Sequence, residues 1–573
     1  MKKYFLIFAY VAFVASKQSS ESSDSHSGSG ENIHQFRPTV TLPQGKLNGI
    51  IQRTFEGEYI LSFIGVRYAE APINKLRFKP PVAVQRSSDE YDAGKVRPAC
   101  PQPGNLLTDE DCLFINVHTR KIPKKGKNPK YPVIVYVHPG SFTTLSGNAD
   151  YVGPQYLLDR KVVLVTFNYR LAALGFLSTG DKFSPGNNGM KDQVEALRWV
   201  KQNIIAFGGD PDCVTLAGYS VGGVSAALHL TSPMSKGLFH RIMIMSGSAF
   251  GNSILPSNQL ELAQKQAKIV GCPVDTNENM MKCLQDVSAA DLGNSLEKFR
   301  VYGTDPQFFW QFVLEPDFGQ ERFLTEHPLD AIRKGHVSDV PVFTGVTYDE
   351  LVALAYPTVT NATALEIFNK DAYNIFPFAF YYDPYANNTD HITSQLRKYY
   401  FNGQPVNETS LIPLGELYSD GLAGFAVNRG ARLLSEYLSN KVYYYTFTYR
   451  GRYSNFLPPG SNNKYVVHFD DQLYVFWNSL QFPKFIKSDP EALMVKKLTT
   501  LYYNFARYGN PTPTLKKKLD FVRWTAHSEQ NGEYLDIGDV LQIKRDLFKK
   551  RYNIWDPLFP LPPLLNNTKT LSY

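Results

Sequence analysis

The chain has 573 residues, of which 43% are hydrophobic and 14% aromatic, and its 60 basic and 53 acidic residues leave a formal net charge of +7. This composition supports a large apolar core and excludes a disordered main body. The basic residues are dispersed, without the basic, aromatic-rich face that nucleic-acid binding needs, so no nucleic-acid partner is expected. The lysine-rich runs at 121–130 and 516–518 are predicted to be solvated loops.

A targeting pattern occupies the amino terminus. Two lysines precede an apolar run at 4–14, and two small residues follow it. This layout predicts a cleaved signal peptide over 1–16 and a secreted, extracellular protein; an uncleaved anchor is the minority alternative, and no stable membrane span is expected elsewhere. Residues 17–35, rich in Ser and Gly, predict a disordered leader before a single domain over 36–560, and 561–573 predict a flexible tail.

Five cysteines fit an oxidising compartment in which four of them pair. Proximity in the sequence suggests disulfides between Cys100 and Cys112 and between Cys272 and Cys283. Cys213 is then expected to be a buried free thiol.

Four N-x-S/T tripeptides are candidate glycosylation sites in a secreted chain, although such tripeptides also arise by chance. They begin at Asn361, Asn387, Asn407 and Asn566.

Early strands are predicted at Gly45–Gly49 and Ile60–Val66. The segment at 63–81 reads FIGVRYAEAPINKLRFKPP, and 110–117 reads EDCLFINV. Both resemble opening signatures of the type-B carboxylesterases, the cholinesterase-like branch of the α/β-hydrolases, although Arg67 replaces the usual proline. The resemblance implies the same first disulfide that sequence proximity suggests.

A buried central strand is predicted at Tyr131–Val137. The residues after it, HPGSF at 138–142, resemble the family's H-G-G-G-F loop, whose backbone amides help to build an oxyanion hole. The resemblance places donating amides at Gly140 and Ser141 and places Phe142 beside the substrate. If the position of Ser141 requires a positive φ angle, the serine there is strained.

Strands and helices alternate in the next part of the chain. A strand at Val162–Phe167, a helix at Met190–Phe207 and a short strand at Val214–Leu216 precede the pattern G-x-S-x-G centred on Ser220, and a helix follows at Val224–Leu230. This order predicts parallel βαβ crossovers under a mostly parallel sheet, with functional loops at the carboxyl ends of its strands.

Family resemblance continues to about Pro511. The segment at 168–177, NYRLAALGFL, is close to N-Y-R-L-G-x-L-G-F-L. Further strands are predicted at His240–Met245 and Val442–Phe447, and a long helix at Ala492–Tyr508.

Ser220 is the predicted nucleophile. A tight strand-to-helix turn lifts such a hydroxyl out of the sheet, and Gly218 and Gly222 let the backbones pass. Alone, the motif is also compatible with chance in a chain of this length. The resemblance implies a third oxyanion amide at Val221, and a place in the substrate pocket for Tyr219, which stands where many relatives carry Glu.

A serine nucleophile needs a base, and in α/β-hydrolases the acid and then the histidine follow the serine along the chain. His391, beside a sequon, is expected at the surface, and His527 falls in a polar turn beyond the last long helix. His468 follows residues 465–467, a predicted strand end, and is the best candidate. HFDDQLYVF at 468–476 also resembles the family's catalytic-histidine segment, with Phe469 in place of a small residue.

The acid is one of two neighbours, Asp349 and Glu350, which follow a predicted strand at Pro341–Val346. Spacing alone does not separate them. The family pattern G-x-x-x-D-E-G implies Glu350 as the acid that orients His468, with Asp349 as a structural partner.

The predicted fold class is α/β: an α/β-hydrolase fold with a central, mostly parallel sheet flanked by helices, and large insertions that form a gorge or cap. The resemblance implies a secreted, arthropod-type serine carboxylic-ester hydrolase that works through an acyl-enzyme without a metal or organic cofactor. Tyr219 in place of Glu, and a Cys100–Cys112 loop without aromatics, favour neutral hydrophobic small-molecule esters over quaternary ammonium substrates. The alternative is an inactive adhesion or binding protein similar to neuroligin or glutactin; the individual ester and the oligomeric state are open.

Overall fold

The computed structural model describes residues 37–104, 106–124, 127–252, 259–459, 465–561 and 563. The predicted signal peptide and leader, and nearly all of the predicted tail, lie outside the described residues. Within them, no helix combines the length and the apolar character needed to cross a bilayer.

Strands of the main sheet follow the spatial order β14-β13-β12-β11-β10-β9-β7-β8-β6-β4-β3, and β1, β2 and β5 form a small separate sheet. Their bounds are β1 Thr39–Leu42, β2 Gly45–Asn48, β3 Ile50–Arg53, β4 Tyr59–Arg67, β5 Glu90–Asp92, β6 Phe114–Thr119, β7 Tyr131–Val137, β8 Val163–Phe167, β9 Gly209–Tyr219, β10 Arg241–Met245, β11 Val342–Thr347, β12 Val442–Phe447, β13 Glu533–Ile537 and β14 Leu541–Arg545.

Parallel pairing runs without interruption from β8 through β7, β9, β10, β11 and β12 to β13. The pairs at the two edges, β13 with β14 and β8 with β6, β6 with β4 and β4 with β3, are antiparallel. The predicted mostly parallel sheet is therefore confirmed. Because parallel strands end at one edge of the sheet, the loops after β7, β9, β10 and β11 meet there.

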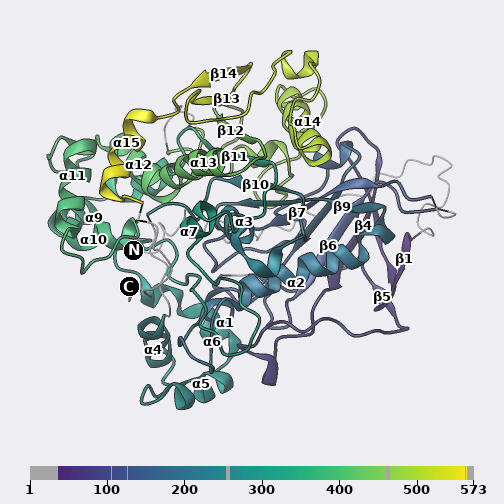
Figure 1. The fold of residues 1–573 in the computed structure, drawn as a ribbon, viewed down its shortest axis with the longest axis horizontal. Coiled ribbons are helices and arrows are strands. Elements are labelled where there is room, and N and C mark those ends of the chain that lie inside the picture. The colour runs from purple at the N-terminus through teal and green to yellow at the C-terminus, as the bar shows by residue number, and fades with distance from the viewer. Residues whose placement is uncertain are drawn as a thin grey trace, which may run out of the picture.

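Helices cover both faces of this sheet (Figure 1). Their bounds are α1 Ala172–Phe176, α2 Asn188–Asn203, α3 Val221–Thr231, α4 Leu260–Ile269, α5 Asn277–Asp286, α6 Ala289–Gly293, α7 Pro328–Arg333, α8 Val352–Val359, α9 Ala362–Lys370, α10 Ala372–Ala379, α11 Thr389–Phe401, α12 Leu411–Ser419, α13 Phe425–Tyr437, α14 Ala492–Tyr508 and α15 Lys549–Leu558. A short 3-10 helix at Ile204–Phe207 extends α2 to the end predicted from its apolar stripe.

The alternating side chains of the central strands divide the apolar core into two parts, one on each face of the sheet. Val133, Val135 and Val137 of β7 pack with α2 and α3, whereas Ile134 and Tyr136 pack with α14 on the other face. Alternate side chains of a strand point to opposite faces, so a strand buried on both faces reads as one continuous apolar run.

A third apolar cluster joins α8–α12 and α15 at one side of the molecule, away from β1 and β5 (Figure 1). The insertion that builds it begins directly after Glu350, where α8 starts. This helical region is a large insertion, and along the chain it lies next to one of the candidate catalytic residues.

Candidate active site

Ser220 lies at the tight turn between β9 and α3, with φ 58° and ψ −127°. A Cβ atom at Gly218 would lie 1.9 Å from the carbonyl oxygen of Gly222, and one at Gly222 would lie 2.3 Å from the carbonyl oxygen of Val137. Backbone packs on backbone at both glycines, which is why the motif needs residues without side chains there. A non-glycine residue in such a conformation costs on the order of 1–3 kcal/mol, so the surrounding structure must hold Ser220 in place.

His468 and Glu350 form a buried pair. The imidazole Nδ1 donates a hydrogen bond to Glu350 Oε1, and the backbone N–H of His468 donates to the carbonyl oxygen of Glu350 at 2.7 Å. The side chain of Glu350 is 2% exposed and that of His468 is 9% exposed. Because the carboxylate accepts from Nδ1, it fixes the tautomer in which Nε2 is the basic nitrogen.

The other carboxylate oxygen of Glu350 is also held. Oε2 accepts hydrogen bonds from the amide and the hydroxyl of Thr347 at 2.6 and 2.8 Å, and it lies 3.1 Å from the hydroxyl of Ser246. Sequence analysis did not identify Thr347 or Ser246. The one available signal is their position, since Thr347 ends β11 and Ser246 directly follows β10.

Asp349, the neighbouring acid, has a different partner. Its Oδ2 accepts the Val466 amide at 2.9 Å, and its own amide donates to the Val466 carbonyl oxygen at 2.9 Å. Asp349 thus anchors the segment before His468, and Glu350 is the acid that contacts the imidazole. The strand expected at 465–467 is not formed; this segment is held by side-chain and loop contacts instead of a sheet ladder.

Tyr219 is completely buried at the end of β9. The centroid of its ring lies 5.0 Å from that of the His468 imidazole and 4.6 Å from that of Phe469, on which it stacks. Its hydroxyl oxygen accepts a hydrogen bond from the Phe469 amide at 2.9 Å. The residue before Ser220 therefore packs against the imidazole and against the residue that follows His468.

The loop after β7 contains three consecutive residues with positive φ: Gly140 at 109°, Ser141 at 57° and Phe142 at 58°. The amides of Thr143 and Thr144 close the turn, each donating to the Gly140 carbonyl oxygen at 2.9 Å. A Cβ atom at Gly140 would lie 2.1 Å from the carbonyl oxygen of Thr144, so a side chain is excluded there. The position of Ser141 has a positive φ angle, the condition under which a serine there is strained.

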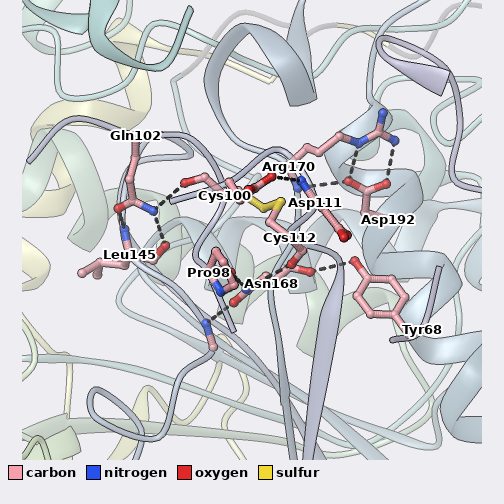
Figure 2. The surroundings of a disulfide bond; sticks show 12 residues. Tyr68, Pro98, Cys100, Gln102, Asp111, Cys112, Leu145, Asn168, Arg170 and Asp192 are labelled. Atoms are coloured by element: carbon pink, nitrogen blue, oxygen red, sulfur yellow. Dashed lines mark hydrogen bonds and ion pairs between the residues drawn. A yellow bond between two sulfur atoms is a disulfide. The ribbon is translucent and has the colours of Figure 1, made fainter. Parts of the chain in front are cut away.

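The Cys100–Cys112 disulfide supports this loop. Beyond the turn, the Leu145 amide donates to Gln102 Oε1 at 2.7 Å, and Gln102 Nε2 donates to the Leu145 carbonyl oxygen at 2.9 Å. Figure 2 shows both bonds beside the disulfide. Since β7 also pairs in parallel with β9, the loop leaves the sheet next to Ser220 and is fixed at both ends.

Phe142 is completely buried in an aromatic cluster. Its ring centroid lies 4.9, 6.4 and 6.2 Å from those of Phe176, Phe308 and Phe312. Its carbonyl oxygen accepts the Ala172 amide at 2.7 Å. The surroundings of the loop are therefore strongly apolar.

Burial sets the charge of the ionisable groups around the pair. It raises the pKa of Asp471 to about 6, with Glu350 adding to the rise, and the pKa of Asp470 to about 7. Burial also raises the pKa of Tyr219 well above its usual value, with Asp471 and Glu350 contributing. The side chain of Tyr219, which precedes Ser220, is therefore uncharged at neutral pH. No group of His, Cys, Asp and Glu suited to hold a metal ion occurs in the described part of the chain.

The other two downstream histidines lie elsewhere. His391 is exposed on α11, as expected. His527 is buried, which corrects the polar turn predicted for it: its amide donates to the Val442 carbonyl oxygen at 2.7 Å, and Nδ1 donates to the Glu533 carbonyl oxygen at 2.8 Å. Packing against the first residues of β12 and β13 removes it from water, and burial lowers its pKa.

Both predicted disulfides are present, and Cys213 is a buried free thiol. Three of the four sequon asparagines are exposed, and all three lie in the helical region between α8 and α12; they are Asn361, Asn387 and Asn407. Asn566 lies outside the described residues.

A family model described as the carboxylesterase family matches residues 37–555. Juvenile hormone esterase from Tribolium castaneum is 31% identical over 526 residues, covering 88% of this chain and 88% of that protein. Esterase FE4 from Myzus persicae is 32% identical over 518 residues, covering 86% of this chain and 90% of that protein. The crystal structure of juvenile hormone esterase from Manduca sexta with OTFP covalently attached matches with a TM-score of 0.82 and 26% identity, over 92% of this chain and 100% of that chain.

Proposed function

The chain belongs to the carboxylesterase family, and we propose that it is a secreted serine hydrolase that uses Ser220, His468 and Glu350 on neutral hydrophobic esters. The observation that carries this proposal is the buried pair of Glu350 and His468 at the same edge of the sheet as the strained Ser220 turn. A nucleophile, a base and an orienting acid, each on its own loop, are the parts that acyl transfer requires.

In the proposed mechanism, His468 Nε2 takes the proton of Ser220 as Oγ attacks the ester carbonyl carbon. The amides of Gly140, Ser141 and Val221 hold the negative oxygen of the tetrahedral intermediate. Val221 is the first residue of α3, where the amide groups and the helix dipole favour an anion. The imidazolium, stabilised by Glu350, then gives its proton to the leaving alcohol.

Water completes the cycle. His468 takes a proton from a water molecule that attacks the acyl-enzyme carbonyl, the second tetrahedral intermediate collapses, and the proton returns to Ser220 Oγ as the carboxylic acid leaves. No step requires a residue beyond those named.

The proposed substrate class follows from charge and packing. A buried, protonated Tyr219 adds no negative charge beside the nucleophile, and the aromatic cluster around Phe142 makes the neighbouring wall apolar. A cationic alcohol group gains nothing there, whereas an uncharged hydrophobic ester does. Two of the relatives are named juvenile hormone esterase and esterase FE4, and both names specify hydrolysis of an ester.

Secretion is proposed from the amino-terminal pattern together with two disulfides and exposed sequons. Disulfides persist in oxidising compartments, and the asparagines of three sequons are accessible on the helical region. We propose N-linked glycans at Asn361, Asn387 and Asn407, and at Asn566 from sequence alone.

Replacing the nucleophile tests the proposal. Ser220→Ala is expected to lower kcat for p-nitrophenyl butyrate at least about 10³-fold, because the acyl-enzyme cannot form. Ser225→Ala, which removes a buried serine hydroxyl one turn further along α3, is the matched control and is expected to keep activity within about threefold.

A fluorophosphonate probe separates the enzyme from an inactive adhesion protein, because labelling needs an activated serine and no knowledge of the substrate. The parent and Ser225→Ala should be labelled, and Ser220→Ala should not. Hydrolysis by Ser220→Ala at the parent rate would contradict the mechanism, and a parent protein that is not labelled would favour the adhesion alternative.

A further inference from the structure

Tyr219 directly precedes Ser220, and its side chain contacts the loop that carries His468. Its hydroxyl oxygen lies 2.9 Å from the amide nitrogen of Phe469, in the loop that contains His468 and is called the histidine loop below. The same oxygen lies 2.9 Å from Ser246 Oγ. Ser246 Oγ in turn lies 3.1 Å from Glu350 Oε2. Tyr219 thus precedes Ser220 in the chain, packs against His468 and is linked to Glu350 through Ser246.

Phe469 shows why such a contact is needed. It has φ 78°, in the left-handed region that a residue with a side chain rarely adopts. No intrinsic preference of Phe holds this conformation, and the conformation decides where the peptide following His468 points. Two contacts from Tyr219 oppose the strain: the hydrogen bond from the Phe469 amide and the stacking of the two rings, whose planes differ by 27°.

We propose that Tyr219 is a positioning residue, which holds His468 in its productive orientation by fixing Phe469 in the left-handed conformation. This inference rests on the proposed hydrolase function. Catalytic groups must be held within about 0.5 Å of their working positions, and a group on a loop has that precision only when neighbouring contacts supply it.

The chemistry of Tyr219 suits a fixed, uncharged support. The ring fills buried space between the histidine loop and the tight turn at Gly218–Gly222, which is called the elbow below. The hydroxyl can both accept and donate a hydrogen bond. The groups that face it are Ser246, Glu350, Asp471 and Tyr445, besides His468 and Phe469. An acidic side chain at this position would place a further negative charge beside Glu350 and Asp471, which burial would make costly.

Tyr219→Phe removes the hydroxyl and keeps the ring. We expect kcat for p-nitrophenyl butyrate to fall about 10-fold with KM within about twofold, because the imidazole is less well placed in the transition state while substrate binding is untouched. The rate of fluorophosphonate labelling of Ser220 should fall by the same factor, since it reports the activation of the serine directly.

Tyr156→Phe is the matched control. Tyr156 is also buried, its hydroxyl also accepts the amide of an aromatic residue, Phe485, at 2.7 Å, and its ring also stacks on that residue, at 5.9 Å. Tyr156 and Phe485 pack with other aromatic residues, Phe55, Tyr453 and Tyr474. The two variants should lose similar thermal stability, and only Tyr219→Phe should lose kcat.

Variants of Phe469 test whether Tyr219 acts on His468 through the conformation of Phe469. In Phe469→Gly the left-handed conformation costs little, because glycine adopts it freely. Adding Tyr219→Phe in that background should therefore lower kcat less than about threefold. In Phe469→Ala the ring is lost but the strained conformation remains, so the full 10-fold effect of Tyr219→Phe should persist.

Three results would overturn the proposal: an unchanged kcat in Tyr219→Phe, an equal loss in Tyr156→Phe, or an undiminished 10-fold loss in the Phe469→Gly background. None of them depends on the identity of the nucleophile, which Ser220→Ala decides separately. A failure of the hydrolase proposal would appear as an active Ser220→Ala protein, and is thus distinguishable from a failure of the role of Tyr219.

Discussion

The elbow and three segments beside it solve the same steric problem in different ways. In the elbow, Gly218 and Gly222 leave no room for a Cβ atom, which would lie 1.9 and 2.3 Å from carbonyl oxygens. In the neighbouring segments, which are two loops and the start of α1, residues with side chains have unusual backbone angles: Ser141 at φ 57°, Ala172 at 48° and Phe469 at 78°. Glycine is required where backbone packs on backbone, whereas a positive φ alone tolerates a side chain at a cost.

The difference between these two kinds of position shows which residues of the site can be replaced. Ser141 and Ala172 stand at positions where the family patterns H-G-G-G-F and N-Y-R-L-G carry glycine, and Phe469 stands where a small residue is usual. Each keeps the backbone conformation that a glycine would adopt, at a cost of order 1 kcal/mol. A loop can absorb such a cost through new contacts, as Phe469 does through Tyr219, but no contact relieves a collision between a side chain and the backbone.

Gly218→Ala tests the first half of this comparison and should have the largest effect. The added Cβ would force β9 away from α3, so we expect a loss of at least about 3 kcal/mol in the free energy of unfolding and of at least about 100-fold in kcat. Chemical denaturation and ester hydrolysis measure the two.

Gly237→Ala is its control, because Gly237 has φ 74° and no atom within 4 Å of the added Cβ. That variant should lose only about 1 kcal/mol and no activity. If both variants lost the same stability, steric contact would not be what distinguishes the elbow from the loops.

Much of the fold could be predicted from the sequence, because strongly patterned segments decide their own structure. The bounds of β7, β12 and α14 are those expected from their apolar runs, and the two short disulfide loops follow from cysteine proximity. The order of strands, helices and the G-x-S-x-G turn was sufficient for the parallel sheet.

What could not be predicted depends on contacts between loops far apart in the chain. The sequence places Tyr219 directly before Ser220, but nothing in the sequence says that its hydroxyl meets the amide of Phe469 and the hydroxyl of Ser246. His527 was misplaced for the same reason: its polar neighbours in sequence predict solvent, whereas its neighbours in space are Val442 and Glu533.

Asp471→Asn tests whether the histidine loop bears a cost of buried charge in addition to the cost of its strained backbone. This loop buries carboxyl groups as well as a residue with positive φ. Burial raises the pKa of Asp471 to about 6, whereas in the unfolded chain its pKa is about 4. Between these values the folded protein holds a proton that the unfolded chain releases, so stability falls as pH rises from about 4 to about 6, by about 2 to 3 kcal/mol.

Asn cannot titrate, and its carbonyl oxygen can still accept the hydrogen bond that Tyr445 gives to Asp471 at 3.0 Å. Over this pH range, the free energy of unfolding of Asp471→Asn should therefore fall by about 2 to 3 kcal/mol less than that of the parent, as measured by urea denaturation at several pH values. The exposed Asp539→Asn is the control and should keep the slope of the parent. An identical slope in Asp471→Asn would show that this carboxyl group does not contribute a buried charge.

Ser141→Gly and Ala172→Gly test the second half of the comparison and should have the smallest effects. Glycine relieves the left-handed strain at φ 57° and 48° but makes the unfolded chain more flexible, so the net gain in the free energy of unfolding should be about 0.5 kcal/mol or less at each position. Ser141→Ala removes the hydroxyl but keeps the Cβ, and should gain nothing. Both glycine variants should keep kcat within about twofold, since the backbone is already in the conformation that glycine favours. A gain as large in Ser141→Ala as in Ser141→Gly would locate the cost in the hydroxyl, and the strained backbone would then have no measurable share in it.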